Sequence, residues 1–520
     1  MKENSAAKRA KIDLSAFSLS IFPSRSISNS NFTPDQGTIK PMKKKTNVLL
    51  ILSDEHQKYV AGCYGNTQNV TPNLDALAAR GTRFSRAYTT CPICVPARAS
   101  LATGKYVHEI GNWDNAFPYD GSERSWHHEI RDAGLTVDLI GKLHFRSEDD
   151  DNGFSQEHQP LHVVNGIGDP FGCLRQDPPV RFRRKGINSA GEGDTTYQQY
   201  DVRNANRAID WLDEHKEDEQ PWTLFLSLVC PHPPYKVKQE YLNLFDPDEL
   251  PRPPQWKKED WPTHPHYEYM RKYFDATEQH TDDQIKNLIH AYYGLTRFLD
   301  DQIGRVFQQL EALGLDENTT ILYSSDHGEC LSARGLFGKF THYEESGGVP
   351  MILAGPDVPK GAVCHTPVSL LDVHATIYDN LGLDLPIHRN ARSLIELASQ
   401  PEVQRSVFGE YHALNSENGS FLLTDNRFKL IYHAHQAPQL FDLSNDPGEI
   451  NDLSANIEYK ETLETMIARL REICDPEAVD AKAKADQKAL IDRFGGEAQV
   501  RERGFFENSP VPGESPKFKS

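Results

Sequence analysis

Two continuous apolar runs, each followed directly by acidic residues, constrain the fold of this chain most strongly. Residues 47–53 read N-V-L-L-I-L-S before Asp54, and residues 319–325 read T-T-I-L-Y-S-S before Asp326. Strands that are buried on both faces have such runs, and they occur mainly in parallel sheets covered by helices. Similar short runs alternate with segments of helical spacing from about residue 46 to 385. We therefore predict an α/β fold in which a large mixed, mostly parallel sheet is sandwiched between helices.

The pattern changes beyond this region. Three short strands are expected between residues 406 and 433, followed by a helix at 459–474, which together predict a smaller C-terminal α+β subdomain with an antiparallel sheet. The N-terminal residues are rich in Ser, Lys, Asn and Pro, lack an apolar period and are expected to be flexible. The last forty or so residues are expected to form an arm that packs on another surface or on another subunit. The predicted parts are a leader (1–45), a large α/β domain (46–385), an α+β subdomain (386–475) and a C-terminal arm (476–520).

Charge and cysteine usage limit the partners and the compartment. The formal charge is −19 at pH 7 over 520 residues, whereas binding to duplex phosphates needs a basic face, so nucleic acid is not an expected partner. No run approaches about 18 apolar residues, so no membrane span is expected. Eight cysteines are scattered from Cys63 to Cys474 without a disulfide framework, and residues 14–22 lack the clean apolar segment of a signal peptide. We therefore favour the cytoplasm over the periplasm.

Polar side chains follow both of the strongest predicted strands. Asp54 and Glu55 come after the first strand, and Asp326 and His327 come after the second. Open α/β sheets bind their ligands at the carboxyl ends of the strands, and two carboxylates with further hard donors suit a divalent cation such as Ca²⁺ or Mg²⁺. An Asp-His pair alone is more often a turn or a cap, but its place directly after a buried strand favours a metal site. Residues 146–195, rich in Asp, Gly and Pro, are expected to be insertion loops around a site.

The segment with the most specific pattern is residues 91–104, which read C-P-I-C-V-P-A-R-A-S-L-A-T-G. Its two cysteines could form a redox-active or zinc-binding C-x-x-C pair, but no second pair stands at ligand spacing and no thioredoxin-like pattern surrounds it. Cys94 to Arg98, followed by Thr103 and Gly104, instead resembles the signature of type I sulfatases. In that family a formylglycine-generating enzyme oxidises this cysteine to Cα-formylglycine. The resemblance is specific because the modifying enzyme reads the cysteine, proline and arginine at fixed spacing in the extended chain.

The resemblance continues along most of the chain. The motifs that resemble the sulfatase branch of the alkaline phosphatase superfamily are, in order, N-V-L-L-I-L-S-D, T-P-N-L-D-A-L-A, C-V-P-A-R, G-K-L-H, P-H-P-P-Y, S-D-H-G-E, G-K-F-T-H-Y-E-E-S and Q-L-F-D-L-S-N-D-P-G-E-I-N-D-L. They cover about residues 46 to 475. Choline-sulfatase-like and phosphonate monoester hydrolase-like members are the nearest in character. The resemblance implies an alkaline phosphatase-like fold and the metal-dependent hydrolysis of a sulfate monoester.

Matching positions imply a set of site residues. Those implied to bind the metal, Ca²⁺ or else Mg²⁺ or Mn²⁺, are Asp54, Asp326, His327, the aldehyde hydrate made from Cys94 and also Glu55, which stands where many family members have Asp. Those implied to hold the hydrate or the sulfate group are Arg98, Lys142, His144, His232 and Lys339. Either His232 or Lys339 would protonate the leaving oxygen. Asn115 is expected to contact the substrate.

These residues also suit the chemistry of sulfate ester hydrolysis. An anionic sulfur centre repels nucleophiles, so the site must combine positive charge with a positioned nucleophile. A hydrated aldehyde carries two hydroxyls on one carbon: one attacks sulfur, and the other expels sulfate as the aldehyde re-forms. Taken alone, Lys142 and Lys339 could be surface lysines, and His232 could be a structural loop residue.

Two other functions compete with that of a sulfatase. A phosphonate monoester hydrolase or phosphodiesterase of the same superfamily would share the formylglycine and the metal, but such relatives generally replace Lys142 and His144 by other polar residues. A non-catalytic binding protein on this fold is disfavoured because every matched catalytic position is filled. The expected substrate is a small-molecule or carbohydrate sulfate ester. The C-terminal arm predicts a homo-oligomer in which the tail of one subunit borders a neighbour's site.

Overall fold

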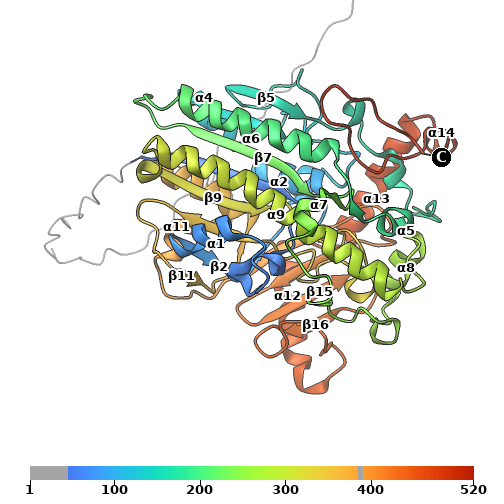
Figure 1. The fold of residues 1–520 in the computed structure, drawn as a ribbon. Helices are drawn as coiled ribbons and strands as arrows, with labels where there is room; N and C mark the ends of the chain where they lie inside the picture. The colour runs from blue at the N-terminus through green and yellow to red at the C-terminus, as the bar shows by residue number, and fades with distance from the viewer. Residues whose placement is uncertain (1–44, 182, 385–390, 520) are drawn as a thin grey trace, which may run out of the picture. The chain divides into compact units, whose positions relative to one another are not determined.

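An eight-stranded sheet in the order β11-β2-β10-β9-β1-β7-β4-β5 lies at the centre of the α/β domain (Figure 1). The computed structural model describes residues 45–181, 183–384 and 391–519. The strands of this sheet are β1 (Asn47–Asp54), β2 (Thr82–Phe84), β4 (Val137–Lys142), β5 (Gln156–Leu161), β7 (Thr223–Pro231), β9 (Thr319–Ser325), β10 (Met351–Ala354) and β11 (Ala362–Cys364). β1, β4, β5, β7 and β9 run parallel, whereas β10 is antiparallel to both β9 and β2. The predicted mixed, mostly parallel sheet is therefore confirmed.

Helices cover both faces of this sheet. Alternate residues of β1 pack on opposite faces: Val48, Leu50 and Leu52 belong to one apolar cluster, and Leu49 and Ile51 to another. The helices that contribute to the first cluster are α2 (Cys94–Thr103), α4 (Trp126–Asp132), α10 (Leu370–Leu381) and α11 (Leu394–Ala398). Those that contribute most to the second are α1 (Pro72–Ala79), α6 (Thr196–Glu214) and α9 (Asp282–Ala312). Because both faces are covered, the central strands consist of almost continuous apolar residues.

A separate antiparallel sheet follows in the chain. Its strands are β13 (Val407–Tyr411), β14 (Ser420–Thr424), β15 (Phe428–His433) and β16 (Gln439–Asp442). α12 (Lys460–Ile473) packs on this sheet through Met466 and Leu470. The predicted α+β subdomain is confirmed. Its fourth strand, β16, was not predicted because it has only four residues and both of its end residues are polar. The predicted boundary between residues 385 and 386 and the predicted leader up to residue 44 lie outside the described residues.

The C-terminal arm is largely helical and packs on its own chain. It contains α13 (Pro476–Arg493) and α14 (Glu497–Arg503). The Ala- and Lys-rich composition of α13 favours a helix. Gln487 Nε2 donates to the backbone oxygen of His412 (2.8 Å), and Phe505 packs with Phe171 in one apolar cluster. The arm therefore lies against a surface of the same chain.

Short elements connect these parts. Further strands are β3 (Ala87–Tyr88), β6 (Gly191–Glu192), β8 (Lys236–Val237) and β12 (Val368–Ser369). Further α-helices are α3 (Val107–Ile110), α5 (Arg183–Asn188), α7 (Gln239–Leu242) and α8 (Pro265–Tyr273). Short 3₁₀ helices are η1 (Lys58–Val60), η2 (Gly62–Tyr64), η3 (Val164–Gly166), η4 (Pro170–Cys173), η5 (Lys258–Asp260), η6 (Asp316–Asn318), η7 (Ala333–Gly335) and η8 (Ile457–Tyr459). The 146–195 region, expected to be loops, thus contains β5, α5 and β6 as well.

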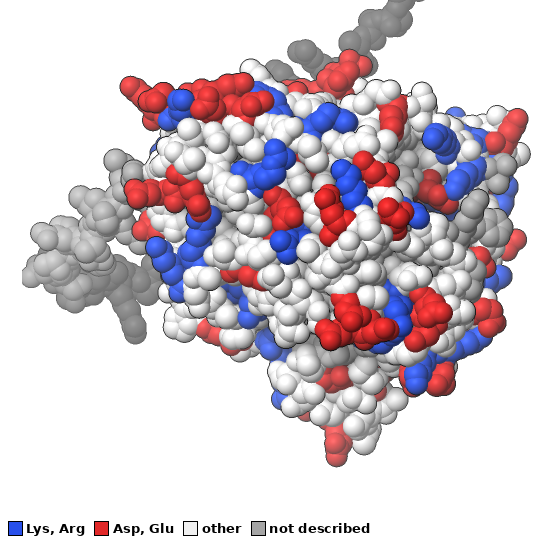
Figure 2. All heavy atoms as spheres, in the orientation of Figure 1, with Lys and Arg blue, Asp and Glu red and all other residues white. Residues whose placement is uncertain are grey.

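The surface carries charges of both signs. On the face shown in Figure 2, the described Lys and Arg side chains are interspersed with Asp and Glu rather than gathered in one patch. Within the described ranges, no helix combines the length and the apolar character needed to cross a membrane. The cytoplasmic location stays a prediction.

Candidate active site

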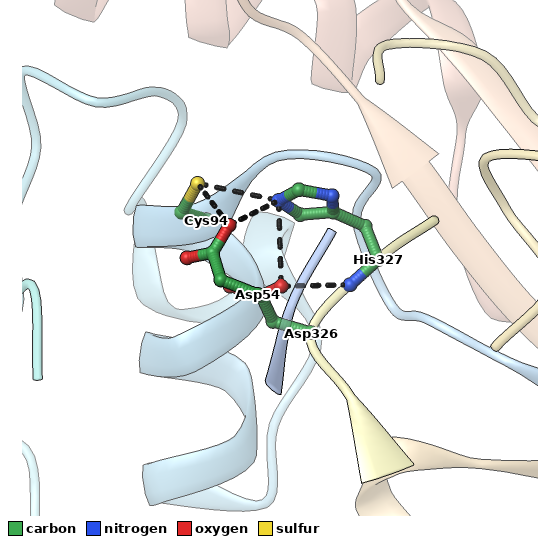
Figure 3. A group of neighbouring side chains, drawn as sticks. All are labelled: Asp54, Cys94, Asp326 and His327. Atoms are coloured by element: carbon green, nitrogen blue, oxygen red, sulfur yellow. Dashed lines mark hydrogen bonds and ion pairs between the residues drawn. The ribbon is translucent and has the colours of Figure 1, made fainter. Parts of the chain in front are cut away.

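The carboxyl ends of β1 and β9 bring two acidic residues together. The two strands are adjacent, parallel and in register, so Asp54 and Asp326 leave the sheet at the same edge. Cys94, the first residue of α2, lies beside them. Figure 3 shows the side chains of Asp54, Cys94, Asp326 and His327 pointing toward one another. The predicted meeting of polar residues at the ends of these strands is therefore present in the structure.

These four side chains form a buried group of ligand atoms, all within 4.8 Å of one another. Cys94 Sγ is 3.2 Å from His327 Nε2 and 3.7 Å from Asp54 Oδ1. His327 Nε2 is also 3.5 Å from Asp326 Oδ1. His327 Nδ1 lies 3.1 Å from the backbone oxygen of Gly328, which leaves Nε2 to face the group. Two carboxylates, an imidazole nitrogen and the group at position 94 fit a divalent cation.

Arg98 joins the two carboxylates. Its Nε donates to Asp326 Oδ2 (2.8 Å) and its Nη2 to Asp54 Oδ2 (3.2 Å). Its Nη1 donates to the backbone oxygen of Lys142 (2.9 Å) and to Ser227 Oγ (2.8 Å). Arg98 is only 3% exposed, so these charge-assisted bonds lie in the interior. The guanidinium thereby fixes the orientation of both acidic side chains.

Two buried lysines add positive charge beside Cys94. Lys142 Nζ donates to Asp54 Oδ2, and Lys339 Nζ lies 3.0 Å from Cys94 Sγ. Lys142 is 1% and Lys339 5% exposed, so the alternative of ordinary surface lysines is wrong. Burial alone would raise the pKa of Asp54, but nearby cations, Lys142 foremost, hold it well below its usual value. Burial raises the pKa of the unmodified Cys94 thiol to about 12, so that thiol is protonated at neutral pH.

Glu55 lies next to the four-residue group. Its Oε2 accepts a hydrogen bond from Lys339 Nζ (2.9 Å) and is 3.5 Å from His232 Nε2. With Asp54 and His232 it forms a second group of side chains that could hold a metal. Burial raises the pKa of Glu55 to about 8, and its φ of 68° is rare for a residue with a side chain. Its role as a metal ligand stays a prediction.

A cavity of about 210 Å³ borders this group. The predicted site residues that line it are Glu55, Cys94, Asn115, Lys142, His144, His232 and Lys339. The other predicted site residues, all buried behind the lining, are Asp54, Arg98, Asp326 and His327. The structure thus brings the predicted site residues into one constellation, with Asp54 and Asp326 beneath and the sulfate-pocket candidates facing the cavity.

The two lining histidines are neutral. His144 Nε2 lies 3.0 Å from Ser509 Oγ, and His232 Nδ1 lies 2.8 Å from the backbone oxygen of Pro233. Burial lowers the pKa of both histidines well below the usual value. Asn115 Oδ1 accepts a hydrogen bond from the backbone N–H of Val95 (3.2 Å), which ties it to the start of α2. Its contact with substrate stays a prediction.

Comparison with known proteins assigns the chain to a family. The sulfatase family model matches residues 46–383, and the model for the C-terminal region of N-sulphoglucosamine sulphohydrolase matches residues 332–475. The chain belongs to the sulfatase family. Membership makes it a hydrolase and implies both a metal and a formylglycine at the site, in agreement with the resemblance found in its sequence.

Relatives of this sulfatase-family chain cover most of its length. Arylsulfatase K of Bos taurus is 28% identical over 475 residues, covering 86% of this chain and 85% of that protein. Choline-sulfatase of Rhizobium meliloti (strain 1021) is 30% identical over 429 residues, covering 79% and 83%. The structure of phosphonate monoester hydrolase of Agrobacterium radiobacter has a TM-score of 0.66 at 22% identity and covers 84% of this chain and 96% of that one. The alkaline phosphatase-like fold is thereby confirmed.

Part of the cavity wall was missed by sequence reasoning. Among the missed residues are Asp169, Arg181, Tyr197 and the tail residues 505–509. The loop-rich composition of residues 146–195 indicated a site nearby but singled out no side chain. The structure places the tail at the cavity of its own chain, whereas we expected it at a neighbour's site. The homo-oligomer therefore stays a prediction, and the position of the tail no longer supports it.

Proposed function

We propose that this sulfatase-family chain hydrolyses a sulfate monoester to an alcohol and inorganic sulfate, using Cα-formylglycine formed from Cys94 and a divalent cation. The position of Cys94 carries the proposal. Its Sγ lines the cavity, 3.2 Å from His327 Nε2 and 3.0 Å from Lys339 Nζ. A reacting group at this position would therefore meet a substrate between the metal ligands on one side and an ammonium group on the other.

The metal would be held by Asp54, Asp326, His327 and the modified residue 94, with Arg98 fixing the two carboxylates. When bound, a cation such as Ca²⁺ supplies positive charge for the sulfate oxygens and for the attacking hydroxyl. The formylglycine hydrate supplies that hydroxyl and a second one for the release of sulfate. Lys142, which pairs with Asp54, provides further positive charge at the cavity wall.

Lys339 is the better candidate for the proton donor to the leaving oxygen. Its ammonium group lies next to position 94, whereas His232 contacts Glu55 at 3.5 Å. Burial alone would lower the pKa of Lys339, but neighbouring acidic groups, among them Asp54 and Asp326, raise it above its usual value, so it carries a proton at neutral pH. His232 is neutral at that pH because burial lowers its pKa. His232 and His144 would instead contact the sulfate oxygens.

The preference for sulfate over a phosphonate monoester is supported by Lys142 and His144, which both line the cavity. The test is a comparison of 4-nitrophenyl sulfate with an aryl phosphonate monoester, using protein co-expressed with a formylglycine-generating enzyme and supplied with Ca²⁺. We expect faster turnover of the sulfate. Faster turnover of the phosphonate would make sulfate hydrolysis secondary. Mass spectrometry that finds Cys94 unconverted, together with no turnover, would favour a non-catalytic binding protein.

The nucleophile is tested by Cys94→Ser, which lacks the second hydroxyl of the hydrate. We expect the turnover number to fall at least about 1,000-fold. Cys91→Ala is the matched control, because Cys91 is equally buried in the same segment but does not line the cavity. It should keep its activity within about threefold. A Cys94→Ser protein with the full rate would refute the assignment.

A further inference from the structure

Asp169 and Arg181 form an ion pair in the wall of the same cavity. Arg181 Nη2 donates to Asp169 Oδ2 at 2.7 Å, and each residue is 6% exposed. The Arg181 guanidinium also packs on the rings of Phe171 and Phe505, with centroids 5.3 Å and 5.2 Å away. Two aromatic rings, one of them from the C-terminal tail, therefore hold the pair in a fixed position.

The second carboxylate oxygen of Asp169 needs a partner. Oδ1 is buried and accepts no hydrogen bond from any residue in the described part of the chain. Buried acceptors without a partner are rare in native proteins because the lost hydration is not replaced. Since Asp169 lines the cavity, a molecule bound there can supply the missing donor.

The wall that carries Asp169 is tied to the segment that carries Cys94. The backbone N–H of Asp169 donates to the backbone oxygen of Asn115 (3.2 Å), whose side chain accepts from the N–H of Val95 (3.2 Å). Gly168 permits this approach: its φ is +74°, and a Cβ there would lie 1.9 Å from the Asn115 oxygen. Asn115 thus links Asp169, whose Oδ1 lacks a partner, to the end of the cavity where Cys94 lies.

The charges around Asp169 indicate which donor it takes. Arg181 neutralises the carboxylate, Arg503 adds a second positive charge nearby, and Glu507 on the same wall pairs with Lys519 at 2.7 Å. Asp114 adds a further carboxyl nearby, but burial raises its pKa to about 7. Among the described residues, these charges leave little surplus negative charge for a quaternary ammonium group, which also has no N–H to donate. An aryl group would leave Oδ1 unsatisfied. A neutral hydroxyl satisfies it with one hydrogen bond.

We propose that Asp169, positioned by Arg181, determines specificity by accepting a hydrogen bond from a hydroxyl of the leaving alcohol. The preferred substrates are then sulfate monoesters of polyhydroxylated alcohols such as simple sugars. This inference rests on the proposed sulfate ester hydrolysis and adds the class of alcohol. Asp169 contacts a part of the substrate that does not react, so its loss raises KM more than it lowers kcat.

The test compares glucose monosulfates, which carry free hydroxyls, with 4-nitrophenyl sulfate, which carries none. Asp169→Ala should lower kcat/KM for the best glucose sulfate by about 10- to 200-fold and change that for 4-nitrophenyl sulfate by less than about threefold. Asp169→Asn keeps an oxygen for Arg181 and replaces the acceptor Oδ1 by a donor, while retaining the packing. It should therefore also lower the ratio of kcat/KM for the glucose sulfate to kcat/KM for 4-nitrophenyl sulfate. Asp177→Ala is the control, because Asp177 is exposed in the same region and does not line the cavity.

The two proposals fail in different ways. If the wild type hydrolyses 4-nitrophenyl sulfate and both Asp169 variants leave the substrate ratio unchanged, the inference is wrong and sulfate hydrolysis stands. If the wild type hydrolyses no sulfate ester, the proposed function is wrong, and glucose binding measured by calorimetry decides the role of Asp169 without turnover. Binding to the wild type that is lost in both variants supports the acceptor role. Equal glucose binding by the wild type and the variants, or no glucose binding by the wild type, overturns the acceptor role of Asp169.

Discussion

Replacing Arg98 by Met tests how the protein tolerates its two buried active-site carboxylates. Arg98 donates to both Asp54 and Asp326, each of which is fully buried. Removing one partner of a buried ion pair costs about 3–5 kcal/mol, because the remaining charge is left uncompensated. Methionine keeps much of the packing of the arginine stem, so the loss reports mainly on the charges.

The expected change in Tm follows from the size of the protein. Unfolding entropy of about 2.1 cal/mol/K per residue amounts to about 1 kcal/mol/K for the unit Lys44–Ser520. A loss of about 3–5 kcal/mol then lowers Tm by about 3–5 °C in the presence of EDTA. Bound Ca²⁺ compensates the same carboxylates, so it should raise the Tm of the variant more than that of the wild type.

Differential scanning calorimetry in EDTA and in Ca²⁺ measures both effects. Arg124→Met is the control, because Arg124 and its partner Asp132 have side chains that are 55% and 51% exposed. Exposed pairs contribute little, so its Tm should move by less than about 1 °C. An Arg98→Met protein whose Tm in EDTA stays within about 1 °C of the wild type would refute the argument.

Other buried charges, the metal and two histidines lead to further predictions. Burial lowers the pKa of His266 and His342 to about 3, so both are neutral in the folded protein and protonate only on unfolding below about pH 6.5. The contribution of these two histidines to stability should therefore be constant above that pH and fall below it by up to about 1.4 kcal/mol per pH unit for each histidine. Between pH 7.5 and 5.5 the urea midpoint of the wild type should fall relative to that of a His266→Gln/His342→Gln variant, and an unchanged difference between the two proteins would contradict this. Lys429 is fully buried and pairs with Glu344 at 3.0 Å, so Lys429→Met should lower the free energy of unfolding in urea by about 3–5 kcal/mol. The control Lys488→Met, at an exposed lysine, should lower it by less than about 0.5 kcal/mol. Similar urea midpoints for the two variants would count against a stabilising Lys429–Glu344 pair. EDTA should abolish sulfate ester hydrolysis and Ca²⁺ should restore it, whereas activity that survives chelation would exclude the metal assignment.

Much of the fold could be predicted because its signals are local. The apolar runs of β1 and β9 appear as uninterrupted segments in the sequence, and the helical spacing of α9 extends over many turns. β16 was missed because four residues carry too little pattern. The helical arm was missed because its residues were interpreted by their position at the end of the chain rather than by their helix propensity.

The residues of the candidate site likewise divide into those that local sequence signals predicted and those that only the fold brings together. Cys94 and Arg98 could be identified because the modifying enzyme reads them in an extended chain, so their pattern must be contiguous in the sequence. Asp54 and Asp326 followed from the rule that parallel strands end at one edge. No comparable rule relates His144 to Ser509, whose side chains meet across 365 residues.

The sequence by itself therefore determined the family and pointed to the proposed reacting residue and to the strand ends that carry the proposed metal ligands. Only the tertiary structure decided which side chains complete the cavity, namely the Asp169–Arg181 pair and the tail residues beside it. The physical reason is that strands and modification motifs depend on neighbouring residues, whereas a cavity wall depends on how distant loops pack. The partner that a buried carboxylate oxygen such as Asp169 Oδ1 lacks becomes visible only once every nearby donor has its place.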